Sequence, residues 1–117
     1  MPLTLIDLGR EVEFIPADAS KVPYRFSVKL VDRTYTFALR YNEAGRFFTA
    51  DLFAPSGEVL ALGDPVRVGR PLFGSIEDER FPIPAIVPCC LDGQRVDAVT
   101  LENFGREVRL ALLQRRP

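Results

Sequence analysis

The chain has 117 residues, of which 47% are apolar and 26% charged, with 15 basic and 16 acidic side chains. This length suits one globular domain with a single hydrophobic core, and the composition argues against disorder. The near-zero net charge gives no overall field that would attract nucleic acid or an anionic membrane. Ten prolines are too many for a helical protein and favour a β protein with well-defined corners.

The N-terminus shows no targeting signal. Residues 1–8 lack a basic region and are interrupted by Asp7, and the longest apolar stretch is far shorter than the roughly 20 residues that span a bilayer. We therefore expect a protein that is made and kept in a cytoplasm, or carried in a particle assembled there.

Residues 1–23 predict short extended pieces. Alternation is weak in residues 3–8 and 11–15, and a proline-bounded connection, residues 16–23, follows them. We favour an edge strand for this region over the alternative, an N-terminal arm that reaches a neighbouring subunit.

Residues 24–63 predict a four-stranded antiparallel meander, because three turn signals separate four strand-like runs rich in β-branched and aromatic residues. Turns are expected around Asp32, Gly45 and Gly57, and residues 63–65 are expected to stop the fourth strand. Alternation predicts one inward face, made of Phe26, Val28, Leu30, Tyr35, Phe37, Leu39, Tyr41, Phe48, Ala50 and Leu52.

Residues 64–117 predict the remaining strands. Residues 66–68 indicate a short strand, residues 74–80 a polar surface loop, and residues 107–113 a last strand. One helical turn is expected at residues 101–105, with Thr100 as its N-cap. Residues 81–88 are apolar but contain three prolines, which predicts an extended segment with edge geometry. This segment is either a strap that covers the core, which we favour, or a docking surface.

The sequence argues against catalysis. The chain has no His, which excludes Ser-His-Asp and Cys-His systems and His-ligated metals. The adjacent pair Cys89 and Cys90 supplies at most two ligands, where a structural zinc site usually needs four. We therefore predict no catalytic residue, no cofactor and no metal, and we expect two reduced cysteines.

The remaining charged residues are expected to be solvated. We assign the notable acids to the surface, with Asp51 facing outward and the others in loops; these are Asp51, Asp64, Glu77, Asp78 and Glu79. Five basic residues are also predicted to face outward on the meander: Arg25, Lys29, Arg33, Arg40 and Arg46. A basic stripe of this kind is typical of single-strand nucleic-acid binders, but alternation puts the aromatic rings on the opposite face. A solvated face or a polar contact with a neighbouring subunit is therefore favoured.

A family resemblance lies in the order of strands and turns. The chain contains in succession "TYTFALRYN", a turn with Gly45, "RFFTADLF", "APSGEVLALGDPVRVGRPLF" and "LENFGREVRLALL". In this order it resembles the small baseplate plug proteins of contractile-tailed bacteriophages, typified by a cyanophage baseplate plug, over residues 22–113. One departure is Phe48, at a position where the family tends to carry Trp; an aromatic anchor is kept.

The resemblance implies a structural virion protein and not an enzyme. It would be assembled in the host cytoplasm, pack in the central hub of the baseplate at the distal end of the tail tube, and help to plug the channel before contraction. Its partners would be hub, spike and tail tube proteins, with several copies in a symmetric assembly and no membrane or specific nucleic acid. The alternative is a small β-barrel module that binds an oligonucleotide or an oligosaccharide.

The expected fold is all-β: a small antiparallel sandwich or partly open barrel built on the meander, in one domain over residues 1–117, with at most one short helical turn near the C-terminus. Proline-punctuated apolar residues are hard to bury centrally in so short a chain, so we expect other chains to cover them. The six candidate interface residues are Leu72, Phe73, Phe81, Ile83, Ile86 and Val87.

Overall fold

The computed structural model describes residues 3–7, 10–74, 80–82, 85–90 and 96–113. In this part of the chain, eight strands form two antiparallel four-stranded sheets, and one 3-10 turn, η1 (Ala19–Lys21), is the only helical element. The all-β prediction is confirmed. The strands are β1 (Leu3–Asp7), β2 (Arg10–Ile15), β3 (Tyr24–Leu30), β4 (Arg33–Asn42), β5 (Phe47–Phe53), β6 (Val59–Pro65), β7 (Ala85–Cys90) and β8 (Val108–Leu113).

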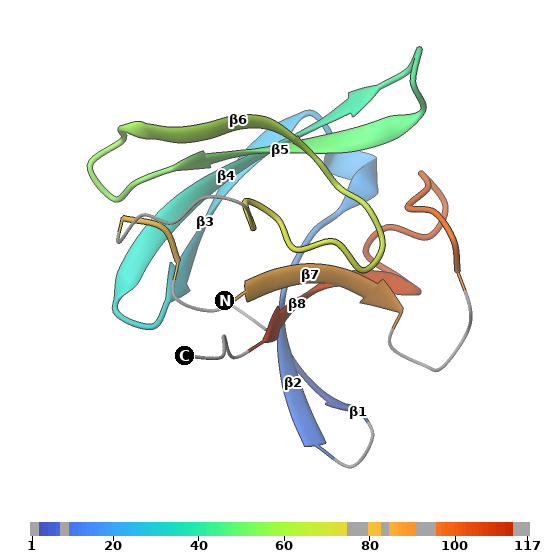
Figure 1. Cartoon of the computed structure of the whole chain (residues 1–117), viewed down its shortest axis with the longest axis horizontal. Coiled ribbons are helices and arrows are strands. Elements are labelled where there is room, and N and C mark those ends of the chain that lie inside the picture. The colour runs from blue at the N-terminus through green and yellow to red at the C-terminus, as the bar shows by residue number, and fades with distance from the viewer. Residues whose placement is uncertain (1–2, 8–9, 75–79, 83–84, 91–95, 114–117) are drawn as a thin grey trace.

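The predicted meander forms the first sheet, in the order β3-β4-β5-β6 (Figure 1). Its register pairs Phe26 with Phe37, and Phe37 with Leu52, so the alternating apolar residues share one face. Phe37 and Phe48 are completely buried, whereas Tyr41 at the end of β4 is half-buried. The predicted inward face of the meander is therefore confirmed.

The fourth strand of the meander is longer and less regular than predicted. β6 continues through Gly63 to Pro65, with two register shifts opposite the segment from Ala50 to Phe53. Gly63 has φ of +70°, a conformation that favours glycine and lets the strand bulge instead of ending. The predicted strand at residues 66–68 is absent from the described structure, where these residues begin a connection that leaves β6.

The second sheet has the order β1-β2-β8-β7 and pairs β2, near the start of the chain, with β8, the last strand (Figure 1). β1 lies at one edge of this sheet, the position that was expected for an edge strand. β7 lies at the other edge, as its proline content predicted. The Pro88 carbonyl points away from β8 and accepts a hydrogen bond from the Gly69 N–H at 2.7 Å, so the missing N–H of the proline interrupts no ladder bond.

Residues 66–73 bridge the two sheets on one side. The Val66 N–H donates to the Phe48 carbonyl at 2.9 Å, and the Leu72 N–H donates to the Ile86 carbonyl at 2.8 Å. This segment therefore covers the outer edge of β7, which would otherwise present unpaired backbone groups. Phe37 from the first sheet and Leu110 from the second belong to one buried core between the sheets.

Candidate interaction surfaces

Four of the six predicted interface residues lie in the core. Leu72, Phe73, Phe81 and Ile86 are between 1% and 6% exposed. The prediction that they form an exposed docking surface is therefore wrong. Val87 is half-buried, and Ile83 lies outside the described residues.

The reason is that the proline-punctuated segments close over the core instead of standing away from it. The rings of Phe73 and Phe81 pack together with their centroids 6.2 Å apart. The buried Tyr35 donates its hydroxyl to the Arg80 carbonyl at 2.8 Å, which fastens the segment before Phe81 to the meander. For the described residues, the covering strap is the correct interpretation.

The outer face of the meander contains two aromatic rings that arginines of the same chain cover. Phe47 and Phe53 face away from the core, as alternation predicts. The guanidinium carbon of Arg25 lies 4.6 Å from the centroid of the Phe53 ring. The guanidinium carbon of Arg67 lies 5.1 Å from the centroid of the Phe47 ring. Such cation–π contacts shield apolar area from water without a second protein.

Asp51 corrects a second prediction. Strand alternation places Asp51 on the outward face, where it was expected to be solvated. It is only 2% exposed and is therefore buried. Its Oδ1 accepts a hydrogen bond from the Gly63 N–H at 2.8 Å, and its Oδ2 lies 3.1 Å from an Arg40 Nη. The bulge of β6 turns the Gly63 N–H towards the carboxylate, an effect that strand alternation cannot anticipate.

Asp64 is also more buried than predicted, with its side chain 17% exposed. Its carboxylate accepts a hydrogen bond from the Phe73 N–H at 3.0 Å and pairs with Arg70 at 3.3 Å. Asp64 thus holds the bridging segment in place. The other predicted acids, residues 77–79, lie outside the described residues.

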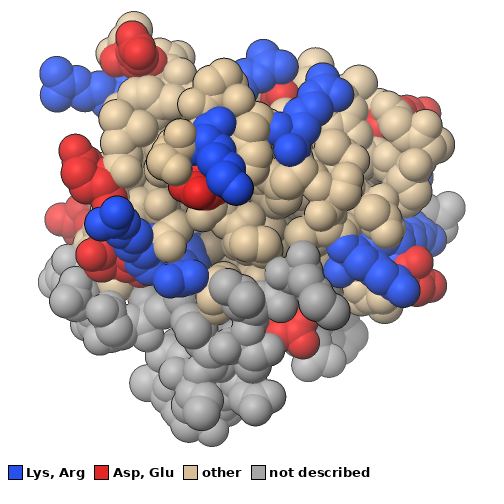
Figure 2. Space-filling model, turned by 180° about the vertical axis from the view of Figure 1, so that it is seen from behind, with Lys and Arg blue, Asp and Glu red and all other residues tan. Residues whose placement is uncertain are grey.

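The five predicted basic residues are all exposed, but they do not build one continuous site. Arg25 lies on Phe53 and Arg40 on Asp51, so these two basic side chains already contact partners within the chain. On the face shown in Figure 2, Lys and Arg side chains are spread among acidic and uncharged residues instead of merging into one block. This arrangement does not favour a track for a nucleic-acid backbone.

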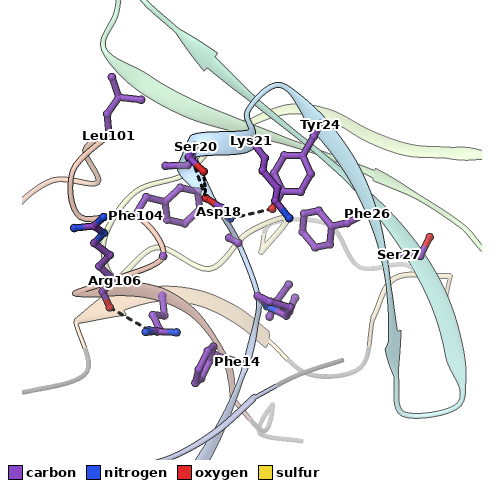
Figure 3. A pocket seen from close by; sticks show the side chains of 16 residues that line it. Phe14, Asp18, Ser20, Lys21, Tyr24, Phe26, Ser27, Leu101, Phe104 and Arg106 are labelled. Atoms are coloured by element: carbon purple, nitrogen blue, oxygen red, sulfur yellow. Dashed lines mark hydrogen bonds between the residues drawn. The ribbon is translucent and has the colours of Figure 1, made fainter.

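A cleft of about 760 Å³ was not predicted from the sequence. One wall is β3 and the connection that precedes it, and the other is the turn of residues 101–106, with β2 and β8 below (Figure 3). Phe14 and Phe104 are buried and form part of its floor, and the half-buried Tyr24 and Phe26 line one side. The cleft therefore combines aromatic surface with a polar rim.

Asp18 and Ser20 order the connection along one wall. Asp18 Oδ1 accepts hydrogen bonds from the Ser20 hydroxyl at 2.6 Å and from the Ser20 N–H at 3.0 Å. These two bonds, the hydroxyl first, lower the pKa of Asp18 below its ordinary value of 3.8. The Asp18 N–H donates to the Tyr24 hydroxyl at 2.9 Å, and burial raises the pKa of Tyr24 above 10.0.

The opposite wall lies where one helical turn was predicted. The Phe104 N–H donates to the Thr100 carbonyl at 3.0 Å, which closes a single hydrogen-bonded turn and not a helix. Thr100 Oγ1 accepts a hydrogen bond from the Asn103 N–H at 3.2 Å, and Asn103 Oδ1 accepts one from the Thr100 N–H at 2.8 Å. This reciprocal cap confirms Thr100 as the start of the turn. Gly105 ends it with φ of +89°, and a Cβ there would collide with the Ala17 carbonyl.

Sequence reasoning missed the cleft because its walls are far apart in the chain. The proline-bounded connection and the turn ending at Gly105 were each predicted, but their local patterns do not identify each other as the segments that meet. The signal that hinted at a close approach is Gly105 itself, since glycine is favoured where two backbones come into contact.

The described residues contain no group of three or more His, Cys, Asp or Glu that would hold a metal ion. Cys89 and Cys90, both half-buried on β7, form no disulfide. No helix in the described part of the chain is long and apolar enough to cross a membrane.

Comparison with known proteins identifies the family. A family model described as the cyanophage baseplate Pam3 plug gp18 matches residues 12–115, nearly the whole chain. No curated protein and no solved structure gives a significant match. The family match agrees with the resemblance in strand and turn order, and this protein therefore belongs to the baseplate plug family, a family of structural proteins of the phage tail baseplate.

Proposed function

We propose that this protein packs in the central hub of a phage tail baseplate, at the distal end of the tail tube, and helps to close the channel until the tail contracts. The observation that carries the proposal is the family match over residues 12–115. The role is structural, needs no catalysis, and is performed by residues 1–117 as one domain.

The packing of the interior supports a closing role. Side chains of both sheets fill the space between them, and the rings of Phe48 and Phe104 meet there with their centroids 4.7 Å apart. A body whose interior is filled by aromatic and aliphatic side chains blocks a channel, whereas a hollow barrel would leave an opening.

The proposed partners are the hub, spike and tail tube proteins, with several copies arranged symmetrically and assembly in the host cytoplasm. The buried strap leaves other surfaces for these contacts. Among the strands that the structure describes, β6 pairs only with β5, and its side chains Val59 and Leu62 are 51% and 65% exposed. An edge strand with exposed apolar residues is suited to contact with another subunit.

The proposal is tested by purifying tails from phage that carry an affinity-tagged copy of this chain. We expect the protein to remain with the baseplate fraction in a fixed ratio to the hub protein, and to occupy the channel when the particles are imaged. We also expect phage lacking the gene to produce tails with an open distal channel. A tagged chain found only outside the particles would overturn the proposal, as would channels that stay closed without it.

A further inference from the structure

The cleft has a lining that indicates what it binds. We propose that it receives an extended acidic segment of a neighbouring baseplate protein, with carboxylates at the basic rim and an apolar side chain against the aromatic surface. The identity of this partner as a baseplate protein rests on the proposed function; its acidic chemistry rests on the cleft.

The charge of the cleft is the first argument. Three cations line it, Lys21, Arg106 and Arg109, against one carboxylate, Asp18. Asp18 accepts two hydrogen bonds from Ser20 and interacts electrostatically with Lys21 and Arg106, so its negative charge offsets one of the three positive charges. Lys21 and Arg106 are exposed and form no ion pair with any described residue. The rim therefore carries an excess of positive charge that complements an acidic ligand.

The position of the cations is the second argument. Lys21 lies on one wall and Arg106 on the other (Figure 3). The third cation, Arg109, is held at the floor beside Phe14, because its Nε donates to the Arg106 carbonyl at 3.1 Å and its guanidinium lies 4.6 Å from the centroid of the Phe14 ring. A chain lying along the cleft would meet positive charge on both sides.

The cleft is also held open before any ligand arrives. The close approach of Gly105 to the Ala17 carbonyl fixes the distance between the two walls, and the bond from the Asp18 N–H to the Tyr24 hydroxyl fixes the connection to β3. A preformed site loses less conformational entropy on binding than one that must be ordered.

The aromatic rings favour a peptide over a nucleic acid. Base stacking needs exposed ring faces, but here the rings stack on protein. Phe26 lies between Tyr24 and Phe37, with centroids 5.2 Å and 5.6 Å away, and Arg109 covers the Phe14 ring. These rings offer edges and aliphatic neighbours to a ligand, which suits an apolar side chain. The exposed Leu101 at the rim adds to this apolar surface.

The chain's own tail is a poor occupant. Its last residues are Gln114, Arg115, Arg116 and Pro117, which carry the same sign of charge as the rim. A segment from another protein is therefore the occupant that the charges favour.

The test uses the full-length protein and overlapping synthetic peptides that cover the hub, spike and tube proteins of the same phage. Binding is measured by fluorescence polarisation. We expect at least one peptide with several carboxylates to bind, and we expect the double variant Lys21→Glu, Arg106→Glu to weaken it by about tenfold or more. Lys29→Glu, an exposed lysine on β3 outside the cleft, is the matched control and should leave affinity within about twofold. Thermal melts confirm that each variant is folded.

Three results would overturn the inference: no acidic peptide binds, the cleft variant and the Lys29→Glu control bind equally, or an oligo-dT strand binds more tightly than every peptide. Incorporation into the baseplate tests the proposed function separately from peptide binding. If a cleft variant loses peptide binding but still enters the baseplate, the plug role stands and the cleft is not needed for assembly. A wild-type chain that binds acidic peptides but is missing from baseplates contradicts the plug role and leaves the acidic chemistry of the cleft supported.

Discussion

Asp51 Oδ1 accepts a hydrogen bond of 2.8 Å from the backbone N–H of Gly63, across the bulged pairing of β5 and β6. The other oxygen, Oδ2, is buried and lies 3.1 Å from Arg40, close enough for an ion pair, but it forms no hydrogen bond with a described residue. The Arg40 side chain is 62% exposed, so solvent screens its charge. The backbone N–H of Gly63 is therefore the better partner of this buried carboxylate.

The first prediction separates these two contacts. Asp51→Ala should lower the free energy of unfolding by about 1–3 kcal/mol, because it leaves the Gly63 N–H without its acceptor at the bulge. Arg40→Ala should cost less, about 1 kcal/mol or below, because the ion pair is screened. Urea denaturation of both variants measures the order, with Glu43→Ala in the exposed turn as the control. A larger loss for Arg40→Ala would show that the ion pair, and not the Gly63 bond, stabilises Asp51.

The second prediction tests the register of the meander. Phe37 is completely buried, so Phe37→Ala should destabilise the protein by about 3–5 kcal/mol through lost apolar burial and a cavity. Its neighbour Thr36 is only partly buried and shares a hydroxyl hydrogen bond of 3.1 Å with Ser27, so Thr36→Ala should cost about 1 kcal/mol or less. Denaturant unfolding of the Phe37→Ala and Thr36→Ala variants measures which one loses more free energy of unfolding. The reverse order would mean that β4 presents its other face to the core.

The third prediction concerns the wall of the cleft. Gly105 and Gly57 have nearly equal positive φ, +89° and +92°, but a Cβ at residue 57 meets nothing within 4 Å, whereas one at residue 105 meets the Ala17 backbone. Both alanine variants suffer backbone strain. Gly105→Ala should lose about 1 kcal/mol or more beyond Gly57→Ala, because the backbone must also move. Equal melting temperatures for the two variants would mean that the backbone of the cleft wall moves away from Ala17 without a measurable loss of stability.

The fourth prediction concerns pH. The pKa of Asp18 is depressed in the folded state, chiefly by the Ser20 hydroxyl, so this interaction stabilises the fold fully above the ordinary pKa of 3.8 and is lost as pH falls through the lower folded value. Ser20→Ala should raise the pKa of Asp18 towards 3.8, although the Ser20 N–H remains as a donor. NMR titration of the carboxyl carbon follows the change. An unchanged pKa in Ser20→Ala would remove the hydroxyl as the main cause.

The fifth prediction concerns the cysteines. Cys89 and Cys90 are half-buried on β7, form no disulfide, and belong to a protein proposed to assemble in a reducing cytoplasm. The double variant Cys89→Ser, Cys90→Ser should therefore enter baseplates like the wild type. Non-reducing gels of purified tails provide the second measurement. A band between subunits that disappears with reductant would show that one of these thiols links two chains.

The sequence predicted the meander well because each part of its pattern is local. Alternation in β3 and β4 reports which face is buried, and the turns carry residues with known preferences. The inward positions of Phe37 and Leu52, the edge position of the proline-containing β7, and the cap at Thr100 all follow from such local rules.

The failures share one physical cause, which is contact between segments distant in sequence. Alternation predicted that Asp51 faces outward, but it did not show that the bulge of β6 would bring the Gly63 N–H to its carboxylate. Proline content predicted an extended segment at residues 81–88, but it did not show which distant residues that segment would contact. Phe81 packs on Phe73, and the carbonyls of Ile86 and Pro88 accept hydrogen bonds from the N–H groups of Leu72 and Gly69. Four of the apolar residues that were expected to need a partner, Leu72, Phe73, Phe81 and Ile86, are buried by the chain itself. The cleft was not predicted at all.

The pairing of β2 with β8 has a consequence for the order in which the protein folds. The hairpins of the meander connect neighbours in sequence and can close early, whereas the second sheet needs β8, which is synthesised last. Until then the inward face of the meander, with Phe37, Leu39 and Phe48, has no cover from the C-terminal strands. We expect a chain that ends before β8 to aggregate through this face instead of yielding a smaller working domain.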